Sequence, residues 1–257
     1  MTYRKVNILP MAGHGKRFQD FNKEIPKPLI DVSGEPMFLR AAKCMPKADL
    51  WIFICQNSIF NHEIFKKTIN ENFKNYEIIS IDYITDGQAR SCDLARKLLK
   101  EDDEIFIRCC DNYTEYNMEE YLKKIKVFDA IVFTTKPDEY LLKNINAYAW
   151  LNSENSKVKK ITCKSQLSEN PKLDSVMVGS FAFKNLNTYK KSIDSIFEKK
   201  LKINNEYYLD MALAEAVNLN FNVGEIFVNK FFNWGNPEVL KTSLKNDHLF
   251  LNVQNFL

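Results

Sequence analysis

The chain has 257 residues, of which 45% are hydrophobic and 27% are charged, so it has enough apolar material for a buried core and no compositional sign of disorder. Its 36 basic and 33 acidic residues leave a net charge of only +3. This small charge argues against nucleic acid or a membrane as the partner and favours a small ligand. The length is ordinary for one large α/β domain, and we predict a single domain over residues 1–257.

The cysteines and the N-terminal segment indicate the cellular compartment in which the protein is expected. The six cysteines show no CxxC spacing and mostly lie in apolar runs, which favours reduced, buried thiols over zinc ligands or disulfides: Cys44, Cys55, Cys92, Cys109, Cys110 and Cys163. The apolar segment before Pro10 is too short for a secretory signal, and no later run reaches the length of a membrane span. We therefore expect a cytoplasmic protein.

The first half of the chain alternates between two patterns. Short runs of β-branched and aromatic residues predict strands at 6–9, 50–55, 76–84, 104–110 and 129–135. Apolar residues at three- and four-residue spacing predict helices between them, at 35–45, 61–73, 89–99 and 118–126. Such alternation predicts a mainly parallel sheet with helices on both faces, which binds ligands beyond the carboxyl ends of its strands.

The alternation of predicted strands and helices ends after residue 135. Three strand-like runs follow with little helix between them, at 146–152, 158–164 and 175–183. They predict an antiparallel or mixed extension of the sheet. Helices are predicted again at 186–201 and 205–219, and one late strand at 221–233.

The loop after the first strand has a composition that suits phosphate. Gly13 and Gly15 leave backbone amides bare of side chains, and such amides can wrap around phosphate oxygens. A dinucleotide fingerprint needs a third glycine where Phe18 stands, and no Gly-Lys-Ser/Thr of a P-loop follows. The pattern indicates a phosphate cradle, with a simple tight turn as the alternative.

Basic residues crowd the same loop. Lys16, Arg17, Lys23 and Lys27 all follow the glycines, and Lys27 stands between two prolines that stiffen the chain. A cation held at a fixed place is suited to a phosphate ligand. For Lys16 and Lys23, an ordinary surface charge is the alternative.

At this point the residues carry a family resemblance. The segment "MAGHGKRF…PKPLIDVSGEPM" (residues 11–37) resembles the signature of the nucleoside-diphosphate-sugar pyrophosphorylases, the sugar-1-phosphate nucleotidyltransferase family. The resemblance implies a Rossmann-like fold with a mixed, mainly parallel sheet, in which the loop wraps a nucleoside triphosphate. Arg17 and Lys27 would neutralise its phosphates, and contacts to the nucleotide would come from Met11, Ala12, Gly13, His14, Gly15 and Lys16. For His14, a tolerated loop residue is the alternative.

The resemblance extends to a second nucleotide segment and a metal ligand. "DGQARSCDLA" is similar to the family's Gly-x-Ala segment, which implies nucleobase contacts from Gly87, Gln88 and Ala89. "RCCDNY" resembles the family's Gly-Asp-Asn strand end, which implies that Asp111 binds Mg²⁺. An acid that ends an apolar strand of a parallel sheet suits this cation independently, and a turn-capping Asp is the alternative.

The acceptor side departs from the family pattern. The resemblance implies Lys164 on the acceptor phosphate and Asn112 and Gly179 near the acceptor. "FFNWGNPEVL" is similar to the closing Asp-x-Gly-Thr-Pro-Glu segment, but the second metal carboxylate falls on Asn233, and the Glu expected before Lys164 is Cys163. An Asn can offer a carbonyl oxygen but no charge. Glu206 and Asp210 could replace the missing Glu, with solvated acids on an amphipathic helix as the alternative.

The implied reaction is an in-line attack by an acceptor phosphate on the α-phosphorus of a nucleoside triphosphate. Arg17, Lys27 and Lys164 would be the catalytic residues, with Mg²⁺ as cofactor. No general base is needed, because the second pKa of a phosphate is about 6. Residues 1–135 would form the nucleotide-binding half and 136–257 the acceptor-binding half.

Three functions remain open at this point. The first is a sugar-1-phosphate nucleotidyltransferase that serves surface polysaccharide synthesis. The second is a CTP-dependent cytidylyltransferase for a non-sugar phosphate, of the phosphocholine or phosphoglutamine type used in capsule modification. The third is a catalytically silent relative that senses nucleotide. The sequence leaves open the nucleobase and whether the protein forms a homo-oligomer.

Overall fold

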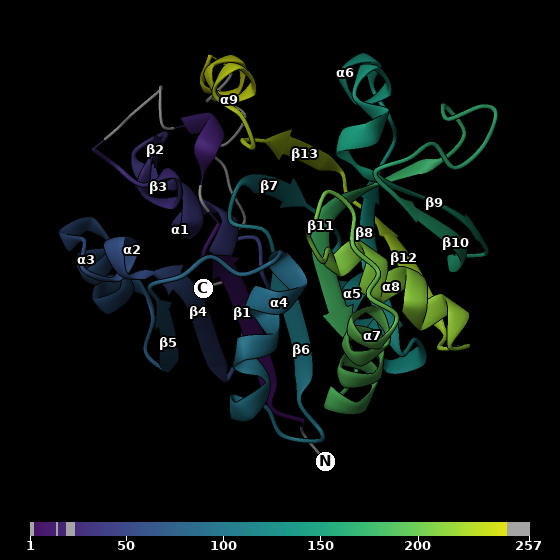
Figure 1. Cartoon of the computed structure of the whole chain (residues 1–257), viewed down its shortest axis with the longest axis horizontal. Helices are drawn as coiled ribbons and strands as arrows, with labels where there is room; N and C mark the ends of the chain where they lie inside the picture. Colours follow the sequence, from purple (N-terminus) through teal and green to yellow (C-terminus); the bar gives the residue numbers. More distant parts are fainter. Residues whose placement is uncertain (1–2, 14, 19–23, 246–257) are drawn as a thin grey trace.

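The computed structural model describes residues 3–13, 15–18 and 24–245, and its centre is a nine-stranded sheet (Figure 1). The strands follow one another across the sheet in the order β5 (Tyr76–Ile81), β4 (Leu50–Gln56), β1 (Lys5–Met11), β6 (Glu104–Arg108), β11 (Ser175–Phe183), β8 (Ala130–Thr135), β12 (Val223–Phe227), β10 (Lys157–Cys163) and β9 (Ala149–Glu154).

The sheet is parallel where the sequence predicts it and antiparallel in the C-terminal extension. β5, β4, β1 and β6 are parallel neighbours, and β12 is parallel to β8. β11 runs antiparallel between β6 and β8, and β10 and β9 complete an antiparallel edge. The predicted α/β fold class is therefore confirmed. Because β11 separates β6 from β8, the two halves of the chain share one sheet.

Helices cover both faces of the sheet. The helices have these bounds: α1 (Met37–Ala42), α2 (Asn57–Phe60), α3 (Glu63–Asn72), α4 (Gln88–Asp93), α5 (Met118–Val127), α6 (Glu139–Lys143), α7 (Leu186–Glu198), α8 (Leu209–Asn218) and α9 (Pro237–Leu244). One core packs α4, α7 and α8 against the sheet face turned to the viewer in Figure 1, and a second packs α1, α3 and α5 against the other face.

The apolar run of β1 shows why helices have to cover both faces of the sheet. Val6 and Ile8 belong to one core, whereas Leu9 and Met11 belong to the other. A strand buried on both faces reads as a continuous apolar run, which is the pattern in the sequence. Asn7 interrupts this run, and its buried Nδ2 donates to the carbonyl oxygen of Pro46 at 2.7 Å.

The predicted late strand at 221–233 is wrong, because two strands occupy it. β12 ends at Phe227, and β13 (Lys230–Asn233) leaves the main sheet to pair antiparallel with β7 (Asn112–Glu115). The register pairs Asn233 with Asn112. This small sheet brings the chain beyond residue 230 next to the end of β6.

Other boundaries differ from the prediction by local turns. The predicted helix at 61–73 becomes α2 and α3, and the predicted helix at 89–99 continues from α4 into a 3-10 turn, η3 (Leu94–Leu98). A 3-10 turn, η4 (Ile145–Ala147), delays the strand predicted from residue 146. The hairpin of β2 (Asp31–Val32) and β3 (Glu35–Pro36) was not predicted. Within the described ranges, no helix combines the length and apolar character needed to cross a membrane.

Candidate active site

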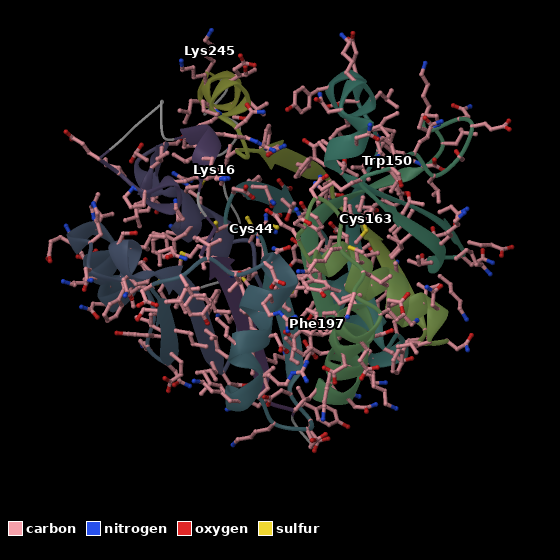
Figure 2. All side chains as sticks on the ribbon, in the orientation of Figure 1. Lys16, Cys44, Trp150, Cys163, Phe197 and Lys245 are labelled. Atoms are coloured by element: carbon pink, nitrogen blue, oxygen red, sulfur yellow. The ribbon has the colours of Figure 1, made fainter. Side chains whose placement is uncertain are left out.

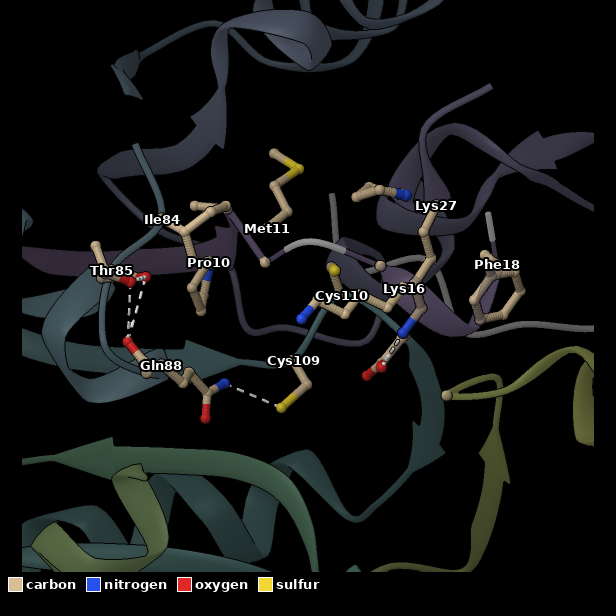
Figure 3. A pocket seen from close by; sticks show the side chains of 18 of the residues that line it. Pro10, Met11, Lys16, Phe18, Lys27, Ile84, Thr85, Gln88, Cys109 and Cys110 are labelled. Atoms are coloured by element: carbon tan, nitrogen blue, oxygen red, sulfur yellow. Dashed lines mark hydrogen bonds and ion pairs between the residues drawn. The ribbon is translucent and has the colours of Figure 1, made fainter. Parts of the chain in front are cut away.

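A cavity of about 440 Å³ opens where β1 and β6 end (Figure 3). This is the sheet edge at which the sequence predicts the ligand. Most of the predicted nucleotide residues line it, together with one residue predicted for the metal and one for the acceptor: Met11, Ala12, Gly13, Gly15, Lys16, Arg17, Lys27, Gly87, Gln88, Asp111 and Glu206. Cys109, Cys110 and Gly235 lie among them.

A second cavity, of about 500 Å³, lies beside the first. Arg17 lines both cavities, and Lys164 lines only the second. Cys163, at the end of β10, lies well away from Lys16 in the glycine-rich loop (Figure 2). The remaining predicted site residues line neither cavity: Ala89, Asn112, Gly179, Asp210 and Asn233. His14 lies outside the described residues.

The glycine-rich loop closes as a tight turn that leaves room for a ligand. Gly15 has a φ of +61°, and its carbonyl oxygen accepts from the backbone N–H of Phe18 at 2.8 Å. A Cβ on Gly15 would lie 3.2 Å from the Cβ of Lys27, so glycine lets the two segments approach. Among the residues that the structure describes, a Cβ on Gly13 would meet no atom within 4 Å, so these residues leave space for a ligand beside Gly13.

Lys27 and Asp111 form an ion pair at the cavity wall. The Lys27 Nζ donates to Asp111 Oδ2 at 2.6 Å, and it lies 5.1 Å from the centre of the Phe18 ring (Figure 3). Burial disfavours both charges, but the attraction outweighs it, so the pKa of Asp111 lies below its ordinary value and the pKa of Lys27 above its own. Both groups are therefore ionised at neutral pH.

Asp111 and Asn233 present oxygen atoms to one small space. A Cβ built on Gly235 would lie 2.8 Å from Asn233 Oδ1 and 3.6 Å from Asp111 Oδ2, so only glycine leaves this space free. The backbone fixes the approach, since Trp234 N–H donates to the Asp111 carbonyl oxygen at 2.8 Å. One carboxylate and one amide oxygen fit Mg²⁺, which takes few protein ligands and completes its shell with phosphate and water.

The segment predicted to contact the nucleobase is fixed by backbone contacts with the second half of the chain. Tyr207 N–H donates to the Asp86 carbonyl at 2.8 Å, and Ala89 N–H donates to the Tyr207 carbonyl at 3.0 Å. Gly87, at a φ of +120°, lies between them, and a Cβ there would be 2.4 Å from the Tyr207 backbone. Gln88 faces the cavity, and its Nε2 donates to Cys109 Sγ at 3.1 Å.

Arg108 is a residue that the sequence reasoning missed. Its side chain is fully buried at the end of β6, where it donates to the Thr114 and Ser180 hydroxyls at 2.6 and 2.8 Å. It also donates to Asn112 Oδ1 at 2.7 Å and to the Asn112 carbonyl at 3.0 Å. Asn112 is thus engaged with Arg108. A charged residue within the apolar run "EIFIRCC" was the available signal.

The second cavity is lined by cationic and amide side chains. Lys164 has a φ of +56°, and its Nζ donates to the Ala147 carbonyl and lies 5.0 Å from the centre of the Tyr208 ring. Further polar residues of the lining are Lys143, Asn144, Asn146 and Asn204. No carboxylate is among the described lining residues. Such a wall suits a phosphate and hydroxyl groups better than a cation.

Two groups lie next to Lys164 without lining this cavity. Burial raises the pKa of Asp210 to about 6, although the charge of Lys164 opposes the rise. Burial also raises the pKa of the Cys163 thiol. Cys163 is therefore neutral at physiological pH and cannot supply the charge of the Glu that the resemblance leads one to expect there.

Comparisons with known proteins identify the family and the fold. A family model described as "Nucleotidyl transferase" matches residues 6–213. A mannose-1-phosphate guanyltransferase of Debaryomyces hansenii is 26% identical over 138 residues, which are 51% of this chain and 38% of that protein. The match therefore spans well under half of that relative.

Two solved structures show the same fold over nearly the whole chain. The nucleoside-diphosphate-sugar pyrophosphorylase from Vibrio cholerae RC9 has a TM-score of 0.75 at 16% identity, over 93% of this chain and 99% of its own. The inositol-1-phosphate CTP transferase from T. maritima has a TM-score of 0.73 at 13% identity, over 98% of both chains. At these identities, the likeness concerns the fold.

Proposed function

Because the chain belongs to the nucleotidyl transferase family, we propose that it joins a nucleoside triphosphate to a sugar 1-phosphate and releases pyrophosphate. The observation that carries this proposal is the position of Arg17, which lines both cavities. A cation shared by two adjacent sites is suited to hold the two phosphates that react with each other. A role in surface polysaccharide synthesis would follow from such an acceptor.

The first cavity would hold the nucleoside triphosphate. The open backbone around Gly13 and Gly15 would bind its phosphates, and Gly87 and Gln88 would face its base. Lys27 already points into this cavity and would exchange Asp111 for a phosphate oxygen. The protein would thus supply fixed positive charge where the leaving pyrophosphate gains negative charge.

The second cavity would hold the acceptor. Lys164 and Arg17 would orient its phosphate so that one oxygen attacks the α-phosphorus, while the bond from that phosphorus to the β-phosphate oxygen breaks. A phosphate with a second pKa of about 6 is already largely ionised at neutral pH, so no side chain has to remove a proton. Catalysis would then depend on position and charge.

Asp111 and Asn233 would hold the Mg²⁺ that the family resemblance implies. Bound there, the ion would neutralise negative charge on the triphosphate. Among the residues that the structure describes, no group of three or more His, Cys, Asp or Glu side chains could hold a metal ion. A small ligand set is what Mg²⁺ uses when substrate phosphates complete its coordination.

A second candidate is a CTP-dependent transferase for a non-sugar phosphate. Two observations favour it: the neutral Cys163 where the family resemblance implies a Glu that binds sugar hydroxyls, and the fold likeness to an inositol-1-phosphate CTP transferase. Of the two non-sugar phosphates considered from the sequence, phosphoglutamine suits the second cavity better than phosphocholine. A quaternary ammonium needs aromatic or anionic groups, and Lys164 already lies over the ring of Tyr208.

The test is pyrophosphate release with Mg²⁺ for each of the common nucleoside triphosphates combined with each acceptor in turn. Hexose 1-phosphates, inositol 1-phosphate, phosphocholine and phosphoglutamine are the acceptors to compare. Release with a hexose 1-phosphate supports the first proposal, and release only with CTP and a non-sugar phosphate supports the second. Triphosphate binding without release for any acceptor would contradict both and indicate a silent nucleotide sensor.

A matched pair of variants would test the acceptor role of the second cavity. We expect Lys164→Met to lower turnover by roughly a hundredfold or more while triphosphate binding is kept, because Lys164 lines only the acceptor cavity. Lys143→Met removes another cation of that cavity, which is exposed and paired with Glu139. Its effect should be much smaller.

A further inference from the structure

The side-chain amide of Asn233 is hydrogen-bonded at both ends. Its Oδ1 accepts from the backbone N–H of Gly235 at 2.6 Å, and its Nδ2 donates to the hydroxyl of Tyr148 at 2.6 Å. A backbone N–H can only donate, so the oxygen of the amide must be the atom that faces Gly235. The nitrogen must then face Tyr148.

This orientation decides what Asn233 offers to the space beside Asp111. The Oδ1 atom lies on the side of Gly235, where Asp111 Oδ2 also lies. A carboxylate at this position would present an acceptor whichever way it turned, because its two oxygens are equivalent. An amide presents an acceptor in one orientation and an N–H donor in the other, and the donor would repel a cation.

We propose that Tyr148 is a positioning residue: the Gly235 N–H sets which atom of the Asn233 amide faces the cation site beside Asp111, and the Tyr148 hydroxyl holds the other end of the amide in place. The inference rests on the proposed function only in that the site binds a divalent cation. Tyr148 does not line either cavity and would not touch the substrates. It acts through Asn233.

The surroundings of Tyr148 fit this role. Tyr148 lies between η4 and β9, and its carbonyl oxygen accepts from the backbone N–H of Lys164 at 2.9 Å. The neighbouring Tyr140 makes a similar pair, since its hydroxyl accepts from Asn236 Nδ2 at 3.0 Å. The hydroxyls of Tyr140 and Tyr148 are also hydrogen-bonded to each other. The two tyrosines thus hold Asn233 at the end of β13 and Asn236 just after it. The Tyr148 contact also ties the cation site to the backbone of Lys164.

The direct test is cation affinity in the variant Tyr148→Phe, which removes the hydroxyl and keeps the ring. The probe is Mn²⁺ in the presence of tripolyphosphate, and its binding is measured by electron paramagnetic resonance. This probe can be used without knowing the nucleobase or the acceptor. We expect about tenfold weaker Mn²⁺ binding, the usual cost of losing a group that orients a metal ligand. Tripolyphosphate binding in EDTA should be unchanged.

A double-mutant cycle distinguishes orientation from a merely structural role. In the Asn233→Asp background either oxygen can face the cation, so adding Tyr148→Phe should weaken Mn²⁺ binding less than about twofold. Tyr140→Phe is the control, because it removes the contact to Asn236 and the hydrogen bond between the Tyr140 and Tyr148 hydroxyls but keeps the bond from Asn233 to Tyr148. It should therefore weaken Mn²⁺ binding clearly less than Tyr148→Phe does.

Any of four results would overturn the inference. The first three are unchanged Mn²⁺ affinity in Tyr148→Phe, an equal loss in the wild-type and Asn233→Asp backgrounds, and no measurable Mn²⁺ binding by the wild type with tripolyphosphate. An equal loss in Tyr140→Phe would also overturn it, because docking of the whole segment would then be responsible. None of these readouts depends on turnover, so failure of the proposed reaction would be seen separately in the pyrophosphate assay.

Discussion

Lys27 and Asp111 neutralise each other at the wall of the nucleotide cavity, with Lys27 Nζ 2.6 Å from Asp111 Oδ2. The two residues come from different elements, Lys27 from the 3-10 turn η2 (Lys27–Leu29) and Asp111 from the segment after β6. Each is the group that the proposed reaction would use, one for phosphate and one for the cation. Binding of substrate would therefore require both groups to change partners.

The ion pair predicts opposite effects of Asp111→Asn on two measurements. Turnover should fall by roughly a hundredfold or more, because the only carboxylate proposed for the cation is lost. Binding of a triphosphate in EDTA should become tighter, since Lys27 is released and one negative charge is removed from the cavity wall. Calorimetry in EDTA and pyrophosphate release in Mg²⁺ measure the two quantities.

Two results with Asp111→Asn would contradict these expectations. Weaker triphosphate binding in EDTA would mean that Asp111 does not compete for Lys27. Full turnover in Asp111→Asn would remove Asp111 from the cation site. Circular dichroism and thermal unfolding should show that the fold is kept.

Gly87 and Gly13 predict different consequences of the same substitution. Gly87→Ala should lower the free energy of unfolding by at least about 2 kcal/mol, because of its φ of +120° and the close Tyr207 backbone. Gly13→Ala should change it by less than about 0.5 kcal/mol, since a Cβ there meets no atom of the described part of the chain within 4 Å. Gly13→Ala should instead weaken triphosphate binding. Urea unfolding and ligand titration test the pair, and equal loss of stability in both would contradict it.

Asp210 predicts a pH dependence of stability. Its pKa of about 6 in the folded protein lies above the unfolded value near 3.8, so between these values the folded state binds more protons. Its ionisation therefore lowers stability as pH rises through this window. Asp210→Asn should stabilise the protein relative to wild type by about 2–3 kcal/mol more at about pH 7.5 than at about pH 4.

Other charged and titratable groups lie around Asp210 and interact with its charge. Lys164 faces it and opposes the shift, and the thiols of Cys163 and Cys109 and the phenol of Tyr208 lie near enough to feel its charge. Glu206→Gln, at an exposed carboxyl of the preceding segment, is the control. A difference between Asp210→Asn and wild type that is the same at both pH values would contradict the assignment.

The buried hydrogen bonds of Arg108 predict that even a substitution by Lys lowers the free energy of unfolding strongly. Arg108→Lys cannot keep the fork of donors to Thr114, Ser180 and Asn112, so buried acceptors would lose partners. We expect a loss of about 2–4 kcal/mol in the free energy of unfolding. Arg96→Lys, at a partly exposed Arg paired with Asp93 and Asp194, should cost less than about 1 kcal/mol. Equal costs would show that Arg108 has no special structural role.

The sequence was sufficient for the family and the fold because both depend on local patterns. The signature at 11–37 was confirmed as that of a nucleotidyl transferase, and alternating strands and helices gave the sheet. The strands predicted at 50–55 and 104–110 correspond to β4 and β6, which form buried apolar runs, although β6 already ends at Arg108. The Gly13 and Gly15 loop was placed at the end of the first strand, where the cavity lies.

What could not be predicted depends on contacts between distant residues. The split at Val228 follows from the pairing of β13 with β7, which no local pattern reveals. The engagement of Asn112 by Arg108 and the Tyr207 backbone against Gly87 are likewise tertiary. The roles proposed for Asn112 and Gly179 at the acceptor stay predictions.

The contact between Gly87 and Tyr207 bears on how the protein is made. The ribosome delivers the chain from its N-terminus, so β1, β4, β5 and β6 emerge long before residue 207 and before β11, which must enter the sheet between β6 and β8. The loop at residues 86–89 must wait for its backbone partner, and the cation site must wait for Gly235. A nascent chain therefore acquires its nucleotide cavity only after residue 235 has emerged, and a messenger truncated before residue 207 yields a product without it.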